Sequence, residues 1–358
     1  MKKIVLTGGG TAGHVTPNIA LLPALQAAGY EIAYVGSYEG IEKKLIADFN
    51  IPYTGISTGK FRRYLDPKNF SDPFRVMKGF VEARNYLKKY QPDVVFSKGG
   101  FVSVPVVRAA ASLHIPCIIH ESDMTPGLAN KLCIPVAEKV CCNFPETMKN
   151  IPADKAVLTG SPIRAELAQG SKLAGLNMCG FTANKPVIMV IGGSLGAANV
   201  NKAVRDALPK LLEDFQVVHL CGKDKIDNLL LNTPGYKQFE YIKAELKDIF
   251  AMADVVISRA GANAICELLA LKKPNILIPL PAASSRGDQL LNAASFEAQG
   301  YSIVLNEDDI TTNLLVDKVH ELYFNRQNYV DAMSKSHQMD AVKTIMELIN
   351  AAADKKTN

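Results

Sequence analysis

Short apolar runs alternate with amphipathic stretches along almost the whole chain. A run such as Lys3-Ile4-Val5-Leu6 is short and β-branched, which is typical of a buried strand, and a helical pattern follows most of these runs. The alternation predicts an α/β protein with parallel sheets. We expect strands near residues 3–6, 32–35, 94–96, 115–119, 139–142 and 156–159 in the first half, and near 186–191, 217–220, 239–242, 255–258 and 275–278 in the second.

Glycine-rich turns follow the first strand of each half. Gly8-Gly9-Gly10 leads into a helix that Pro17 can begin, and Gly192-Gly193-Ser194 repeats the arrangement. Such a turn is expected to point free backbone N–H groups at a phosphate. The spacing does not match the dinucleotide fingerprint, and no acidic residue ends the strand at 32–35. The repeat therefore predicts two Rossmann-like halves that are not nicotinamide-binding.

Several local features carry their own expectations. Pro23 predicts a kink or a restart in the first helix. Residues 55–75 are interpreted as a long connection, and a helix is expected from Gly79 to Lys89. The adjacent Cys141 and Cys142 are expected to lie one inside and one outside, without a disulfide. The segment from Tyr329 to Ala353 is helical by composition.

Composition and charge narrow the class of protein. The 358 residues suffice for two domains, and 48% apolar with 21% charged residues is typical of a soluble globular protein. We find no signal peptide or spanning segment, and seven cysteines without zinc-like spacing are expected to be reduced. The net charge is +5, and residues 60–89 hold nine basic against three acidic side chains. This excess predicts an anionic partner.

Seven motifs occur in order across residues 8–293: GGGTAGHVTPN, SKGGFVSVPVV, HESDMTPGLANK, TGSPIR, IGGSLGA, ADVVISRAGANAICE and RGDQLLNA. Together they closely resemble the lipid II synthase family, the GT-B glycosyltransferases that complete the peptidoglycan precursor. The resemblance implies two Rossmann-like domains whose parallel sheets face each other across a cleft. Residues 1–163 would form the acceptor and membrane-binding domain and 164–341 the donor-binding domain, with the helix at 342–358 packing back on the first.

The resemblance also implies the reaction. N-acetylglucosamine (GlcNAc) would pass from UDP-GlcNAc to undecaprenyl-pyrophosphoryl-MurNAc-pentapeptide (lipid I) with inversion, giving a β-1,4 linkage without a cofactor, a metal ion or a covalent intermediate. The expected partners are UDP-GlcNAc, lipid I, the anionic inner membrane leaflet and other cell-wall synthesis proteins, and not nucleic acid. The expected location is the cytoplasmic face of the cell membrane, as a peripheral protein.

Matching the family's motifs assigns roles to individual residues. Glu267 would accept hydrogen bonds from the ribose hydroxyls, Arg164 and Ser194 would bind the diphosphate, and Gln289 would contact the sugar hydroxyls. The nucleoside would contact Ile242 and the turn that begins the helix after Gly261. The full set of implied substrate-binding residues is Thr11, Ala12, Gly13, Arg164, Ser194, Ile242, Ala262, Asn263, Ala264, Ile265, Glu267 and Gln289.

An inverting displacement needs a base for the acceptor hydroxyl, and two candidates stay open. His14 lies at the end of the first glycine turn, and its ordinary pKa is near 6.5. Glu121 lies at the carboxyl end of a strand, next to a His120 interpreted as structural. Asp123 and Asp288 depart from residues found in some members of the family, so no role is assigned to either.

Basic and aromatic side chains alternate between Gly59 and Lys89. This pattern is common on a solvated loop and helix, yet it also suits docking on an anionic membrane. Other functions that the sequence allows are a GT-B transferase acting on another membrane lipid, a relative of UDP-GlcNAc 2-epimerase, and a non-catalytic nucleotide-binding membrane scaffold. The epimerase would have no use for the basic stretch, and the scaffold would not need Arg164, Ser194, Glu267 and Gln289 with His14.

Overall fold

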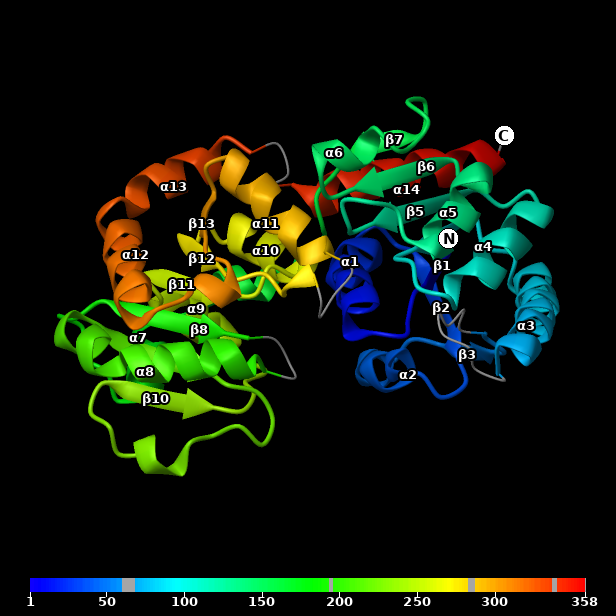
Figure 1. The fold of residues 1–358 in the computed structure, drawn as a ribbon. Coiled ribbons are helices and arrows are strands. Elements are labelled where there is room, and N and C mark those ends of the chain that lie inside the picture. Colours follow the sequence, from blue (N-terminus) through cyan, green and yellow to red (C-terminus); the bar gives the residue numbers. More distant parts are fainter. Residues whose placement is uncertain (60–67, 193–195, 283–286, 337–339, 358) are drawn as a thin grey trace. The chain divides into compact units, whose positions relative to one another are not determined.

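The computed structural model describes residues 1–59, 68–192, 196–282, 287–336 and 340–357. The chain divides into two compact units. The first unit comprises Met1–Arg164 with Asp340–Asn358, and the second comprises Ala165–Met339. Figure 1 shows that each unit is a sheet covered by helices, as expected for α/β halves.

The described residues of the first unit form a seven-stranded sheet in the order β3-β2-β1-β4-β5-β6-β7, with all neighbours parallel. Its strands are β1 (Lys3–Thr7), β2 (Glu31–Ser37), β3 (Tyr53–Ile56), β4 (Val94–Ser97), β5 (Cys117–Glu121), β6 (Lys139–Cys142) and β7 (Ala156–Leu158). Its α-helices are α1 (Thr16–Ala27), α2 (Ile41–Ile46), α3 (Lys68–Tyr90), α4 (Ser103–Ser112), α5 (Leu128–Cys133), α6 (Pro145–Met148) and α14 (Ala341–Thr357).

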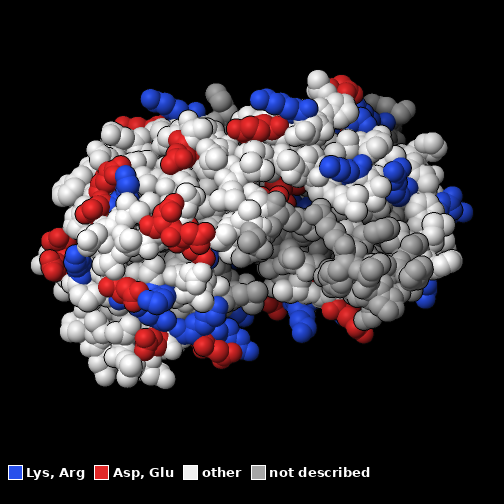
Figure 2. Space-filling model, in the orientation of Figure 1, with Lys and Arg blue, Asp and Glu red and all other residues white. Residues whose placement is uncertain are grey.

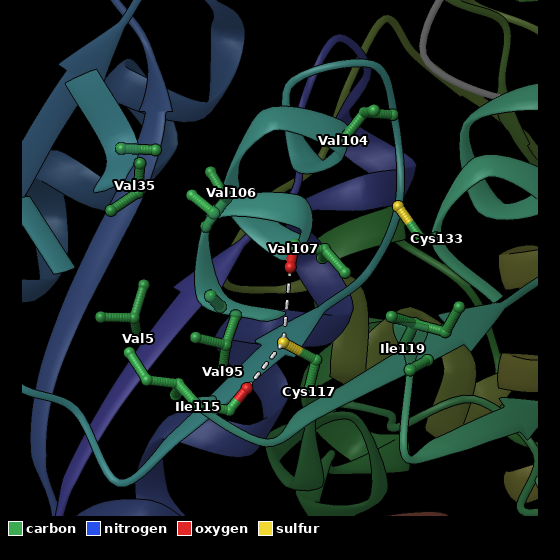
Figure 3. Packing of buried hydrophobic residues seen from close by; sticks show 14 of the residues in the cluster. Val5, Val35, Val95, Val104, Val106, Val107, Ile115, Cys117, Ile119 and Cys133 are labelled. Atoms are coloured by element: carbon green, nitrogen blue, oxygen red, sulfur yellow. Dashed lines mark hydrogen bonds between the residues drawn. The ribbon is translucent and has the colours of Figure 1, made fainter. Parts of the chain in front are cut away.

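Both faces of this sheet are buried, which explains its near-continuous apolar strands. Val5, Val35 and Val95 pack with α3, α4 and α5 on one face, where the Cys117 thiol donates to the carbonyls of Val107 (3.7 Å) and Ile115 (3.4 Å) (Figure 3). The alternate strand residues pack with α1, α2 and α14 on the other face. The last helix of the chain thus belongs to the core of the first unit.

The described residues of the second unit form a six-stranded parallel sheet in the order β10-β9-β8-β11-β12-β13. Its strands are β8 (Val187–Ile191), β9 (Gln216–Leu220), β10 (Tyr236–Phe239), β11 (Val255–Ser258), β12 (Asn275–Leu277) and β13 (Ser302–Val304). Its α-helices are α7 (Lys172–Cys179), α8 (Ala198–Asp214), α9 (Leu246–Met252), α10 (Ala262–Ala270), α11 (Asp288–Ala298), α12 (Thr312–Phe324) and α13 (Arg326–Ser334).

The sequence prediction of a two-half α/β protein is confirmed, but three strands were missed or misplaced. β3 and β13 were not predicted, and β10 ends at Phe239 instead of beginning there. All three are edge strands of three or four residues, and none of them is buried along its whole length. Edge strands of this kind carry no long apolar signal.

Four local expectations also need correction. Helix α1 runs through Pro23 as one element, so the helix does not restart there, and α3 begins at Lys68, inside the predicted connection. The predicted C-terminal helical segment is divided between α13 and α14. Cys141 and Cys142 are both fully buried and free, because they point to opposite faces of a sheet covered on both sides. Burial raises the pKa of both thiols to about 12.

Candidate functional site

Each sheet has a point at which the strand order reverses, and the glycine turns of the first unit lie at its switch point. In the first unit the chain runs outward from β1 to β2 and β3 and then crosses back to β4, on the other side of β1. The strands β1 and β4 therefore flank the switch point. Both strands run into glycine turns, and Gly8, Gly10, Gly99 and Gly100 have φ values of +156°, +86°, +93° and +84°. Open α/β sheets bind ligands at such a point, beyond the carboxyl ends of the strands.

His14 lies at the end of the first glycine turn, in a short 3₁₀ helix of residues Ala12–His14. Its imidazole is half-buried, and Nδ1 lies 3.0 Å from the hydroxyl of Thr11. The pKa of His14 is lowered to about 4, chiefly by burial and then by the charge of Lys98, while the Gly9 carbonyl and the Glu42 carboxylate act in the opposite direction. The ring is therefore neutral at pH 7 and can accept a proton.

Glu121, the other candidate base, is buried and held in place by three donors. Its carboxylate accepts hydrogen bonds from the backbone N–H of Asp123 (2.9 Å), the backbone N–H of Gly127 (3.0 Å) and the side-chain amide of Asn130 (2.9 Å). These contacts tie together the loop between β5 and α5. A carboxylate used in this way stabilises the loop, which favours His14 over Glu121 as the base.

Lys98 was missed by the sequence analysis as a candidate for the site. It follows β4 directly, is only 1% exposed, and donates from Nζ to the ring of His120 (3.0 Å to Nδ1) and to the hydroxyl of Ser122. The His120 Nε2 lies 2.9 Å from the carbonyl of Gly160, so this nitrogen carries the ring proton and Nδ1 accepts from the lysine. The sequence feature that could have identified Lys98 is its position between an apolar strand and two glycines.

Glu42 was missed as well. Its carboxylate is 1% exposed and accepts from the backbone N–H of Gly10 (3.1 Å) and from the backbone N–H (2.9 Å) and hydroxyl (2.5 Å) of Ser37. The expectation that the first turn points free N–H groups at a phosphate is therefore wrong for Gly10. That donor holds the turn in place and is not available to a phosphate.

The second unit repeats the switch point between β8 and β11. Gly261 precedes α10 in an extended conformation, and Ala262, Asn263 and Ala264 form the first turn of that helix. These three residues are half-buried, Ile265 is fully buried, and Glu267 is half-buried one turn further on. The amino end of α10 carries the positive end of the helix dipole, which suits a diphosphate.

A buried ion pair supports the turn before α10. The Arg259 guanidinium donates to the carbonyls of Ile278 (3.1 Å) and Pro279 (3.2 Å) and pairs with the carboxylate of Glu307. The side-chain amide of Asn292 donates to the carbonyl of Ala260 (3.1 Å). The segment directly after β12 and helix α11 thereby fix the backbone on which the predicted donor residues lie.

The structure places the remaining predicted residues as follows. Gln289 is half-buried on α11, and its side-chain carbonyl accepts from the backbone N–H of Leu280 (3.1 Å). Ile242 is buried in the loop after β10, and Arg164 is half-buried at the last residue of the first segment. Thr11, Ala12 and Gly13 form one turn with His14. Ser194 lies outside the described residues.

Within the described residues, no three His, Cys, Asp or Glu side chains are grouped so that they could hold a metal ion.

The comparisons with known proteins agree with a two-unit transferase. The family model for the glycosyltransferase family 28 N-terminal domain matches residues 4–142, and the model for the C-terminal domain of the same family matches residues 187–349. The chain belongs to glycosyltransferase family 28. A relative from Lachnospira eligens, named UDP-N-acetylglucosamine–N-acetylmuramyl-(pentapeptide) pyrophosphoryl-undecaprenol N-acetylglucosamine transferase, is 65% identical over 98% of this chain and 99% of that protein.

Solved structures show the same architecture. The crystal structure of Acinetobacter baumannii MurG is 28% identical with a TM-score of 0.77, and the match covers 98% of this chain and all of that one. A putative UDP-N-acetylglucosamine 2-epimerase from Listeria monocytogenes is 13% identical with a TM-score of 0.72, over 99% of this chain and 98% of that one. The second likeness shows the fold alone. The predicted GT-B class and the resemblance to the lipid II synthase family are confirmed.

Proposed function

We propose that this chain transfers GlcNAc from UDP-GlcNAc to the MurNAc 4-hydroxyl of lipid I, and so makes lipid II for peptidoglycan synthesis. The observation that carries the proposal is the 65% identity, over almost the full length of both chains, to a relative named for this reaction. The alternative functions considered from the sequence gain no comparable support.

The second unit is proposed to bind UDP-GlcNAc. The first turn of α10 would hold the diphosphate and the nucleoside with backbone groups, and Glu267 would accept hydrogen bonds from the ribose. Gln289 would contact the sugar hydroxyls, and Arg164 and Ser194 would neutralise charge as UDP leaves. The fixed backbone around Arg259 supports this role, because a donor site that is already in place loses little entropy on binding.

The first unit is proposed to bind the acceptor and supply the base. A proton on Nδ1 of His14, directed at the Thr11 hydroxyl, leaves Nε2 to accept the proton of the MurNAc 4-hydroxyl. The oxygen then attacks the anomeric carbon of GlcNAc while the bond to UDP breaks and UDP takes the electron pair. The diphosphate of lipid I would raise the pKa of His14 when it binds nearby, because a negative charge favours the imidazolium.

The membrane interaction is proposed to use helix α3. No helix within the described ranges is long and apolar enough to cross a membrane. Phe74, Met77 and Val81 of α3 are 79%, 65% and 52% exposed and follow the i, i+3, i+7 spacing of one helix face. Exposed Arg75 and Lys78 lie beside them. An apolar stripe flanked by cations suits peripheral docking on an anionic leaflet, here the cytoplasmic one.

Figure 2 shows Lys and Arg side chains interspersed with Asp and Glu side chains over the face drawn. The predicted basic stretch at 60–89 falls partly on residues outside the described set, so the proposal relies on the part of α3 from Phe74 onward.

Ligand stabilisation provides the first test. UDP and UDP-GlcNAc at 100 times their dissociation constants should each raise the free energy of unfolding by about 2.7 kcal/mol, whereas NAD should leave it unchanged. The reason is that α10 and Glu267 are proposed to bind a uridine diphosphate, whereas the glycine turns lack the dinucleotide fingerprint. Differential scanning fluorimetry measures the effect. An equal stabilisation by NAD, or none by UDP, would contradict the donor assignment.

A further inference from the structure

The buried carboxylate of Glu42 holds the first glycine turn on one side. The Glu42 carboxylate accepts hydrogen bonds from the backbone N–H of Gly10 and from the backbone N–H and hydroxyl of Ser37, and Gly9 and Gly40 lie directly against it. A Cβ added at Gly9 would lie 2.5 Å from the Glu42 carboxyl carbon, and a Cβ at Gly40 would overlap its oxygens. Both positions must therefore be glycine for the carboxylate to fit. The α2 helix thus places one buried negative charge directly beneath the turn.

A buried positive charge lies on another side of the same turn. The Cβ of Lys98 would be 3.2 Å from a Cβ added at Gly8, and the backbone N–H of Lys98 donates to the carbonyl of Thr7 (2.9 Å). Its ammonium is directed towards the neutral ring of His120 and the hydroxyl of Ser122. Burial and the Lys98 charge hold the pKa of His120 well below its ordinary value, so His120 does not compensate the lysine charge.

We propose that Lys98 and Glu42 are positioning residues that hold the first glycine turn between two buried charges of opposite sign and thereby tune His14 as a base. Neither residue needs to touch the substrate. The catalytic part of the inference rests on the proposed function of His14, whereas the electrostatic part concerns the ligand-free protein alone.

The two charges act on His14 in opposite directions. Lys98 disfavours the imidazolium and Glu42 favours it, while burial is the largest influence. Two further side chains that contact the turn within the described residues are uncharged: the Tyr34 hydroxyl donates to the Gly8 carbonyl (2.7 Å), and the Asn18 amide donates to the Thr7 carbonyl (3.1 Å). Removing either charge therefore has a predictable sign. Without Lys98 the pKa of His14 should rise, and without Glu42 it should fall.

The test is an NMR titration of histidine-labelled protein without substrate. The spectrum of His14→Ala identifies the His14 signal. In the wild type His14 should stay neutral from pH 5.5 to 8, because its pKa is about 4. Lys98→Met should raise that pKa by about one pH unit, the usual size of a neighbouring-charge effect. Adding Glu42→Gln to Lys98→Met should lower the His14 pKa again. The effect of Glu42 is measured in the Lys98→Met background because the pKa is higher there, in a pH range where the protein can be handled.

Controls keep the result specific. Lys273→Met removes a half-buried lysine of the second unit, which donates to the Ala253 carbonyl, and should leave the His14 titration unchanged. Lys98→Gln removes the same charge as Lys98→Met but keeps a polar end, and it serves if the methionine variant does not fold. Native folding of each variant is checked by circular dichroism.

Failure of this inference and failure of the proposed role of His14 give different results. An unchanged His14 pKa in a folded Lys98 variant, or a Glu42→Gln effect of the opposite sign, would overturn the inference. The acid limb of kcat/KM reports the free enzyme, so it should move together with the NMR pKa. If the NMR pKa moves and the acid limb does not, the electrostatic inference holds and His14 is not the base.

Discussion

Replacing His14 with alanine is expected to lower kcat by about 10²- to 10⁴-fold, the usual contribution of a positioned general base. The half-buried imidazole is neutral at pH 7, since its pKa of about 4 lies far below the working pH. It can thus take the acceptor proton as the glycosidic bond forms. The dissociation constant of UDP should change little, because the donor is proposed to bind the second unit. Steady-state kinetics and calorimetry measure the two quantities separately.

Glu267→Ala is the matched comparison, because it removes a proposed donor-binding group from α10. This variant should weaken UDP binding and raise the KM for UDP-GlcNAc, with a smaller effect on kcat. If His14→Ala loses UDP affinity as severely as Glu267→Ala does, His14 binds the donor and is not the base. Glu121 would then return as the leading candidate in spite of its three hydrogen bonds.

The second large effect should appear at the membrane. Changing Arg75 and Lys78 to glutamate should weaken binding to vesicles containing phosphatidylglycerol by at least about 30-fold. The estimate takes about 1 kcal/mol for each cation near an anionic surface. Changing the exposed Phe74 and Met77 to serine should also weaken binding, because both side chains would otherwise insert into the interface. Co-sedimentation with vesicles measures both effects.

The control for the charge change is Lys223→Glu with Lys335→Glu, which alters the same charge at exposed positions of the second unit. This variant should bind vesicles almost as the wild type does. Raising the salt should release the wild type, because charges are screened over about 8 Å at physiological ionic strength. Transfer to a short-chain soluble acceptor should survive the α3 changes. Undiminished co-sedimentation of the α3 variants would place the docking surface elsewhere.

The sequence could predict the features that repeat locally. An apolar strand followed by a glycine-containing turn and a helix was predicted at several points, and the structure confirms the turns after β1 and β11, whereas Gly193 and Ser194 lie outside the described residues. Strands such as β13 were missed because three residues at a sheet edge leave no periodic signal.

The contacts that shape the site are not local, and this is why they were missed. Gly10 and Glu42 are 32 residues apart in the chain, and Lys98 and His120 are 22 residues apart. No pattern within a single window of sequence pairs them. Their meeting depends on the order β2-β1-β4-β5, which brings the ends of four strands together. The sequence therefore predicts which turns form the site, whereas only the fold reveals the charges beneath them.

The most direct test of the central claim is the transfer of labelled GlcNAc from UDP-GlcNAc to a lipid I analogue by the purified protein. The account predicts a single β-1,4-linked product, loss of that product with His14→Ala, and little competition from UDP-glucose. Failure of the wild-type protein to label the lipid I analogue, with transfer instead to another lipid or with epimerisation of UDP-GlcNAc, would contradict it.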